Sequence, residues 1–221
     1  MNILSCYWQI DETIKAWPES VIEQVIPPLL RRRLTDLGKM AFNGFYAASA
    51  GLNGKHVPWV IACRHGDTTR MNRLLTELAR GETLSPTDFS LSVHNAIAAQ
   101  FAIATGNKKM QTALSGGDQS FELGLLEAYA LQKEVNETVG YIYYDYPLPM
   151  QYQLENDVPK VCIAILLSTE NVQDSIKISY QSQSDQGQSG FFPFVGFLEE
   201  GNKETHLNVP GGAFLLERYD G

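Results

Sequence analysis

The sequence has few cysteines, and they have none of the spacings that bind metal or build a disulfide framework. Its three cysteines, Cys6, Cys63 and Cys162, lie far apart in 221 residues and include no CxxC pair. An odd number of distant thiols is typical of free cysteines in a reducing compartment. The first 15 residues have no basic segment followed by a long apolar run, and no apolar run is long enough to cross a membrane. The sequence therefore predicts a cytoplasmic protein without a disulfide, a membrane span or a bound metal.

Positive charge is also scarce. Lys and Arg number 17 against 25 Asp and Glu, which gives a formal net charge of −8 at pH 7. An acidic chain of this kind lacks the basic surface that binds nucleic acid or an anionic membrane. It is also a poor docking surface for an acidic carrier protein, so we expect any carrier to dock on a basic partner instead.

Hydrophobic residues make up 44% of the chain, and at this length they can form one large core. Continuous or alternating apolar runs predict strands at 3–10, 58–63, 110–113, 140–146, 160–168, 175–180 and 213–216. Apolar residues at helical spacing predict helices at 37–45, 71–80 and 92–104 and one that begins near 121. The sequence shows no internal repeat and no linker, so it predicts a single domain over 1–221.

The most informative stretch is 112–128, TALSGGDQSFELGLLEA. A short β-like run ends at Leu114, two glycines follow, and Phe121, Leu125 and Ala128 then recur at helical spacing. The pattern predicts a strand, a tight turn and a helix. α/β enzymes place nucleophiles at such junctions, where the N–H groups at the start of a helix stabilise negative charge. The residue at this junction is Leu114.

This stretch resembles the nucleophile turn of the β-ketoacyl synthases, which have the thiolase fold. The family's motif reads Thr-Ala-Cys, then small residues and glycine, then a helix. In this sequence Thr112, Ala113, Ser115 and Gly116 match that order. Leu114 occupies the cysteine position, so the resemblance implies that the nucleophile position is vacant.

A second match lies upstream of the turn. The segment VHNAIAAQFAIATG, 93–106, is similar to the family's asparagine-containing helix and the glycine that follows it. The whole resemblance covers roughly 58–131. It implies an α/β fold with a thiolase-like N-terminal half, in which a mixed five- or six-stranded sheet has helices on both faces. Since the chain has about half the family's length, the resemblance also implies that the C-terminal half of the fold is missing.

The resemblance implies that the chain has no condensing activity of its own. Ketosynthases use a cysteine together with two histidines from the second half of the fold, and thiolase relatives use a histidine and an asparagine. These groups stabilise charge that an apolar side chain cannot support. His56, His65 and His94 precede the turn and His206 lies near the end of the chain, none of them in the family's histidine motifs. An inactive chain without a cofactor is therefore implied.

Some ketosynthases pair with an inactive homologue, the chain-length factor, which closes the far end of the acyl tunnel and so sets product length. This chain is similar to the small chain-length factor of aryl polyene pathways. The resemblance implies a heterodimer with a full-length β-ketoacyl-ACP synthase in polyene, polyketide or fatty-acid-type biosynthesis. It implies that the acyl carrier protein is reached only through that partner.

The resemblance also implies where the two proteins meet. In the thiolase fold the strand before the nucleophile pairs with its twin, so that one sheet runs through the dimer. Such pairing needs only main-chain groups on a free edge. In this sequence the implied interface strand consists of Lys109, Met110, Gln111, Thr112 and Ala113.

In the resembling family the segment at 89–93 crosses the dimer interface and lines the partner's acyl pocket. Phe89, Leu91 and Val93 are therefore the candidates for a plug, and Leu114 would fill the vacant nucleophile site. A bulky side chain can end a narrow apolar channel because overpacking costs roughly 1–3 kcal/mol. That cost disfavours one more extension unit by about tenfold or more. Each of these four residues could instead be an ordinary core residue.

Two other functions stay open. The chain could be an independent small acyltransferase or thioester hydrolase that uses Ser115 or Cys63 as its nucleophile, and a Cys63–His65 pair is one way to activate the thiol. It could also be a homodimer that carries an acyl chain without acting on it. Turnover of an acyl thioester by the purified chain would favour the first, and a bound lipid in native mass spectrometry would favour the second.

Overall fold

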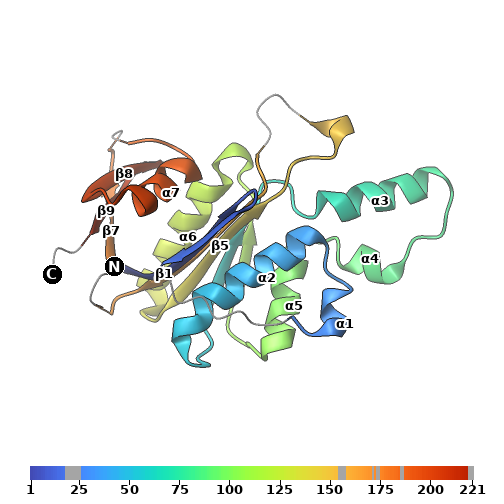
Figure 1. Cartoon of the computed structure of the whole chain (residues 1–221), viewed down its shortest axis with the longest axis horizontal. Coiled ribbons are helices and arrows are strands. Elements are labelled where there is room, and N and C mark those ends of the chain that lie inside the picture. Colours follow the sequence, from blue (N-terminus) through green and yellow to red (C-terminus); the bar gives the residue numbers. More distant parts are fainter. Residues whose placement is uncertain (18–25, 154–157, 171, 173–174, 185–186, 219–221) are drawn as a thin grey trace.

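A nine-stranded mixed β-sheet forms the centre of the protein in the computed structural model (Figure 1). The structure describes residues 1–17, 26–153, 158–170, 172, 175–184 and 187–218. Eight strands follow the order β4-β3-β5-β6-β1-β7-β9-β8, and β2 pairs with β1. The predicted mixed sheet with helices on both faces is confirmed. The predicted number of strands is wrong, because the described residues form nine strands rather than five or six.

Three parallel strands position the candidate site. β3 (Trp59–Ala62) pairs in parallel with β4 (Gln111–Leu114) on one side and with β5 (Val139–Asp145) on the other. Every residue of β3 is buried, as its continuous apolar run predicts. The carboxyl ends of parallel strands meet at the same edge of a sheet, which is where α/β proteins build their sites.

The other six strands continue the sheet with antiparallel pairs. They are β6 (Val161–Ser168), β1 (Asn2–Ile10), β2 (Thr13–Trp17), β7 (Ile176–Ser182), β9 (Gly212–Arg218) and β8 (Glu204–Val209). β6 joins the parallel strands to β1 by pairing with β5, and β7, β9 and β8 extend the sheet beyond β1. β4 and β8 are therefore the two end strands of this order.

Helices cover both faces of the sheet. α2 (Asp36–Ser49) and α5 (Ala96–Thr105) share a core with one face, and α6 (Ser120–Val135) and α7 (Phe191–Glu200) share a core with the other. α6 lies close to the sheet, because a Cβ added at Gly124 would lie 2.6 Å from both the Ala62 Cβ and the Tyr141 ring. The remaining short elements are α1 (Pro28–Arg31) and the 3₁₀ turns η1 (Ala50–Leu52), η2 (Gly117–Gln119) and η3 (Met150–Tyr152).

Two helices extend away from the sheet (Figure 1). α3 (Thr68–Ala79) and α4 (Pro86–Ser90) lie between β3 and α5 in sequence, and most of their residues are exposed. Capping side chains start both helices: the Asp67 carboxylate accepts from the Arg70 N–H, and the Ser85 hydroxyl accepts from the Asp88 N–H. We call residues 67–93 the arm.

The structure differs from the sequence prediction at several boundaries. The sequence predicts none of β2, α4, α7 and β8. The strand predicted at 110–113, which the resemblance extends to an interface strand at 109–113, begins at Gln111. The helix predicted at 92–104 begins at Ala96. α7 has a phenylalanine-rich sequence of a kind that favours strands, but its aromatic side chains pack against α6 as a helix. In the part of the chain described here, no helix is both long and apolar enough to cross a membrane.

Candidate functional site

The turn after β4 has the predicted strand-turn-helix form. β4 ends at Leu114, and α6 begins at Ser120 after a 3₁₀ turn. Gly117 has a φ of 60°, and a Cβ added at Gly116 would overlap the Leu123 side chain. The Ser120 Oγ accepts from the Gly116 N–H at 3.0 Å and donates to the Gly117 carbonyl at 2.7 Å. The backbone path of the turn therefore favours both glycines.

Leu114 is half-buried and packs against the core that α6 shares with the sheet. Its backbone carbonyl oxygen accepts from the Cys63 N–H at 3.3 Å and lies 2.9 Å from the Nε2 of His94. A branched apolar side chain thus stands at the position that the resemblance gives to the nucleophile. Leucine cannot form a thioester, so its side chain supplies no covalent chemistry here.

Cys63 follows β3 directly and is fully buried. Its Sγ lies 3.7 Å from both ring nitrogens of His94 and accepts from the Gly66 N–H at 3.0 Å. The imidazole that contacts the thiol in the described structure is that of His94, whereas the hypothesis paired Cys63 with His65. Burial raises the pKa of the Cys63 thiol far above its usual value, and the Asp145 carboxylate raises it further. A thiol held protonated in this way is a weak nucleophile.

Ser115 is exposed, and its hydroxyl donates to the backbone carbonyl of Arg64 at 2.9 Å. A serine nucleophile needs a base that accepts its proton. The acceptor that the described residues provide is a peptide carbonyl, which is not a base. Within the described structure, Ser115 therefore lacks a base. Cys63 lies beside the imidazole of His94, but burial raises the pKa of its thiol. Across the described residues, no group of three or more His, Cys, Asp or Glu side chains could hold a metal ion.

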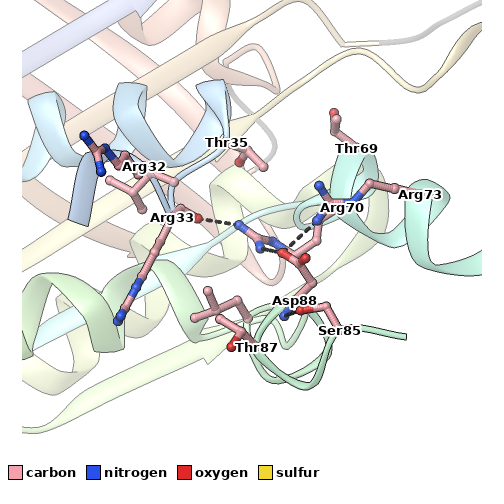
Figure 2. Close-up of a pocket in the computed structure, with 11 residues that line it drawn as sticks. Arg32, Arg33, Thr35, Thr69, Arg70, Arg73, Ser85, Thr87 and Asp88 are labelled. Atoms are coloured by element: carbon pink, nitrogen blue, oxygen red, sulfur yellow. Dashed lines mark hydrogen bonds and ion pairs between the residues drawn. The ribbon is translucent and has the colours of Figure 1, made fainter. Parts of the chain in front are cut away.

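Figure 2 shows the buried side chain that fixes the arm to the body of the protein. Arg70 is only 5% exposed, and its Nε lies 3.3 Å from Asp67 Oδ2. Figure 2 draws its other two contacts: Nη1 lies 2.5 Å from Asp88 Oδ1, and Nη2 donates to the Arg33 carbonyl at 2.7 Å. The contacts join the turn before α2, the start of α3 and α4. They lie beside a cavity of about 320 Å³. Arg73, which is exposed, binds the same Asp88 carboxylate from the surface.

The sequence indicates only one of the two ion pairs that Arg70 makes. Asp67 and Arg70 are three residues apart at the start of a helix, a spacing at which opposite charges meet. Asp88 lies 18 residues beyond Arg70, and only the fold brings it to α3. Sequence reasoning therefore missed Arg70 as the residue that holds the arm.

The three plug candidates differ in exposure. Phe89 and Val93 are 65% and 54% exposed, whereas Leu91 is half-buried and lines the cavity beside Arg70. Phe89 and Val93 are thus not core residues of this chain, and a partner can contact them. We call residues 89–93 the plug segment. Val93 at its end precedes His94, whose ring contacts the carbonyl of Leu114, so the structure brings this end of the plug segment to the end of β4.

α3 carries an apolar stripe on its surface. Met71, Leu75 and Leu78 are exposed, while Leu74 is buried. Apolar side chains at i, i+4 and i+7 share one face of a helix. Gathered apolar side chains on a surface are typical of protein contact sites.

The predicted interface strand lies at the end of the sheet. β4 pairs with β3, and no strand among the described residues pairs with its outer side. Gln111, Thr112 and Ala113 belong to β4, while Lys109 and Met110 precede it and are exposed. In the described structure, main-chain groups on the outer side of β4 are therefore available for pairing with another strand.

A family model described as the N-terminal domain of β-ketoacyl synthases matches residues 7–192. The match includes β3, the arm, β4, the turn and α6. No curated protein sequence matches the chain.

Several solved complexes contain a chain with a similar fold. In the complex of the ketosynthase ApeO with its chain length factor ApeC from Xenorhabdus doucetiae, one chain is 22% identical with a TM-score of 0.69, and the match covers 88% of this chain and 82% of that chain. The ishigamide ketosynthase/chain length factor gives 13% identity, a TM-score of 0.53, and coverage of 72% and 52%. AntDE:AntF, a type II PKS acyl-carrier protein in complex with its ketosynthase, gives 12% identity, a TM-score of 0.52, and coverage of 72% and 56%.

These likenesses show a shared fold, the thiolase-like ketosynthase fold. The chain spans about half the length of the matched chains in the second and third complexes. In the first complex the two coverages are similar, so the matched chain there has about the same length as this one.

Proposed function

Because this chain belongs to the family of β-ketoacyl synthase N-terminal domains, we propose that it is a non-catalytic subunit that pairs with a complete β-ketoacyl-ACP synthase and shapes its acyl channel. The observation that carries the proposal is Leu114 at the end of β4. The strand, the glycine turn and the helix have the form of a nucleophile site, but the side chain cannot form a covalent bond to an acyl group. The buried Cys63 and the carbonyl-bound Ser115 do not replace it.

Two surface features support a partner. The outer side of β4 is free of any described strand, and the arm exposes large apolar side chains in α3 and around Phe89. Two of the solved structures with this fold are complexes of a ketosynthase with a chain length factor. A net charge of −8 makes the chain a poor dock for an acidic carrier, so the acyl carrier protein is reached through the synthase.

The proposed subunit acts by limiting space. The segment with Phe89 and Val93 enters the far end of the partner's channel, where one extra acyl unit would overlap these side chains. Overpacking of about 1–3 kcal/mol corresponds to roughly a tenfold or greater preference for the shorter product. The products belong to polyene, polyketide or fatty-acid-type biosynthesis, and the cytoplasm is the expected location.

The test is co-expression with a complete synthase from the same organism. We expect a 1:1 complex in size-exclusion chromatography and native mass spectrometry. Within that complex, Phe89→Ala should shift the products towards longer chains because it removes the ring that limits the channel. Phe192→Ala is the matched control, since Phe192 is similarly exposed but lies in α7, where it lines another cavity. This control should leave the products unchanged.

Three outcomes would contradict the proposal. If no complex forms with the synthase, the whole proposal fails. If Phe89→Ala and Phe192→Ala give the same products, the segment at 89–93 is not the plug. If the purified chain alone turns over an acyl thioester and Ser115→Ala or Cys63→Ala abolishes this, the chain is an independent acyltransferase or hydrolase instead.

A further inference from the structure

His94 links the plug segment to the end of β4. It follows Val93 directly and precedes α5. Its Nε2 lies 2.9 Å from the carbonyl oxygen of Leu114. A carbonyl oxygen can only accept, so the hydrogen on the imidazole is assigned to Nε2.

The rest of the ring is also held. With Nε2 donating to Leu114, the other nitrogen, Nδ1, is left as an acceptor, and it lies 3.7 Å from the Cys63 Sγ. The same sulfur accepts from the Gly66 N–H at 3.0 Å. The contacts therefore run from the turn after β3 through the buried thiol and the imidazole to the end of β4. In these contacts Cys63 has a structural role, and its thiol can stay protonated.

We propose that His94 is a positioning residue that fixes the segment at 89–93 against the end of β4, and thereby sets how far the segment reaches into the partner's channel. This inference rests on the proposed function. The hydrogen bonds that the plug segment makes with its own backbone are local, such as Ser92 N–H to the Phe89 carbonyl and Ala96 N–H to the Val93 carbonyl. They shape the turn but do not fix it against β4, whereas the His94 contact does.

The position of the segment matters because its two exposed plug side chains lie in α4 and in the turn after it, and not in the sheet. Arg70 holds the start of α4 through Asp88, and His94 holds the other end of the segment. Fixing both ends reduces the freedom of Phe89 and Val93 before the partner binds, which favours one channel length over its neighbours.

The test compares three variants in the complex with the synthase. His94→Ala removes the donor and should change the ratio of adjacent product lengths by roughly three- to tenfold, the range that follows from loss of one hydrogen bond. His94→Gln places an amide N–H at a reach similar to that of Nε2 and should restore the parental ratio. His56→Ala is the matched control, because His56 is exposed and lines a separate cavity between α2 and α5. It should have no effect.

The outcomes separate this inference from the proposed function. If the parent chain forms no complex, the proposed function fails. If the complex forms with equal yield and His94→Ala gives the parental product ratio, the positioning role of His94 fails. A ratio that changes equally in His94→Ala and His94→Gln also refutes it, since the donor would then not be the cause.

A second measurement needs no partner and covers the case in which His94→Ala folds poorly. In the isolated chain, amide hydrogen exchange of the milder His94→Gln variant should match the parent in both 89–95 and 112–116. In His94→Ala both segments should exchange faster together, while α6 is unchanged. Faster exchange in only one of the two segments, or in neither, would show that the imidazole does not couple them.

Discussion

The buried guanidinium of Arg70 holds the arm against the body of the protein. Arg70→Met keeps an unbranched stem but removes the charge and the donors to Asp67, Asp88 and the Arg33 carbonyl. The Asp67 carboxylate would keep its hydrogen bond from the Thr35 hydroxyl at 2.8 Å, but it would have lost its only cation in the described structure. The variant therefore leaves a buried charge without a counter-ion at the root of the arm.

The magnitude follows from the burial of the two carboxylates. Removing one partner of a buried ion pair costs about 3–5 kcal/mol. Asp67 has a side chain that is 7% exposed, but Asp88 is 28% exposed and retains Arg73, so we expect the lower end, about 3 kcal/mol. Arg73→Met is the matched control. Its side chain is 53% exposed and binds the same Asp88, and such surface pairs contribute about 0–1 kcal/mol.

Hydrogen exchange measured by mass spectrometry would resolve this difference, because the lost ion pairs stabilise the arm more than the sheet. For Arg70→Met we expect exchange in residues 67–93 to rise by roughly 100-fold, while amides of β3 and β5 stay protected. For Arg73→Met the rise should be less than about fivefold. Equal effects of the two variants would refute the reasoning, since burial would then not distinguish them. A uniform rise across the sheet would show that Arg70 supports the whole fold rather than the arm.

Three further predictions concern a buried acid, a close contact and the stripe on α3. Burial raises the pKa of Glu122, whose Oε2 has no partner in the described structure, so its contribution to stability is present below the unfolded pKa and is lost as pH rises through the folded pKa. Glu122→Gln should therefore raise the melting temperature at pH 7 but not below about pH 4, and a pH-independent difference would contradict this cause. Gly124→Ala should reduce the free energy of unfolding by about 1–3 kcal/mol in urea denaturation, because the added Cβ would lie 2.6 Å from the sheet. Gly51→Ala, where nothing lies within 4 Å of the added Cβ, is its control, and an equal loss in both would refute the packing argument. Leu75→Glu should weaken binding to the synthase at least tenfold in Kd without lowering the melting temperature, because this leucine is exposed in the free chain; an unchanged Kd would remove α3 from the interface.

The backbone of the site could be predicted from the sequence, because its signals are local. The apolar run that ends at Leu114, the two glycines and the helical spacing after them lie within 17 residues, and the structure has the predicted strand, turn and helix. The contacts around this turn are not local. His94 reaches Leu114 from 20 positions away, and the Arg64 N–H donates to the Asp145 carboxylate across 81 positions. No short pattern encodes such pairs.

The last third of the chain was predicted least well for a related reason. The polar-apolar alternation of β7 was visible, but β8 has only a few apolar residues, and it is a strand because β9 pairs with it along its whole length. The phenylalanines of α7 likewise lie in a helix because, in that conformation, they fill the core shared with α6. Propensity is weak where tertiary packing decides the conformation.

The separation between the edge of the sheet and the chemistry at its end explains how one scaffold can serve two roles. β4 is held by pairing with β3 over four residues, and the turn after it is held by Ser120 and by the packing of α6. These contacts use main-chain groups or other side chains, so the identity of the side chain at 114 can change with little effect on the strand. The outer side of β4 offers main-chain groups as well, and pairing there does not depend on the residue at 114. A change from a nucleophile to leucine would therefore remove covalent chemistry and leave the outer side of β4 intact, which is the combination that the proposed role of a channel-shaping partner requires.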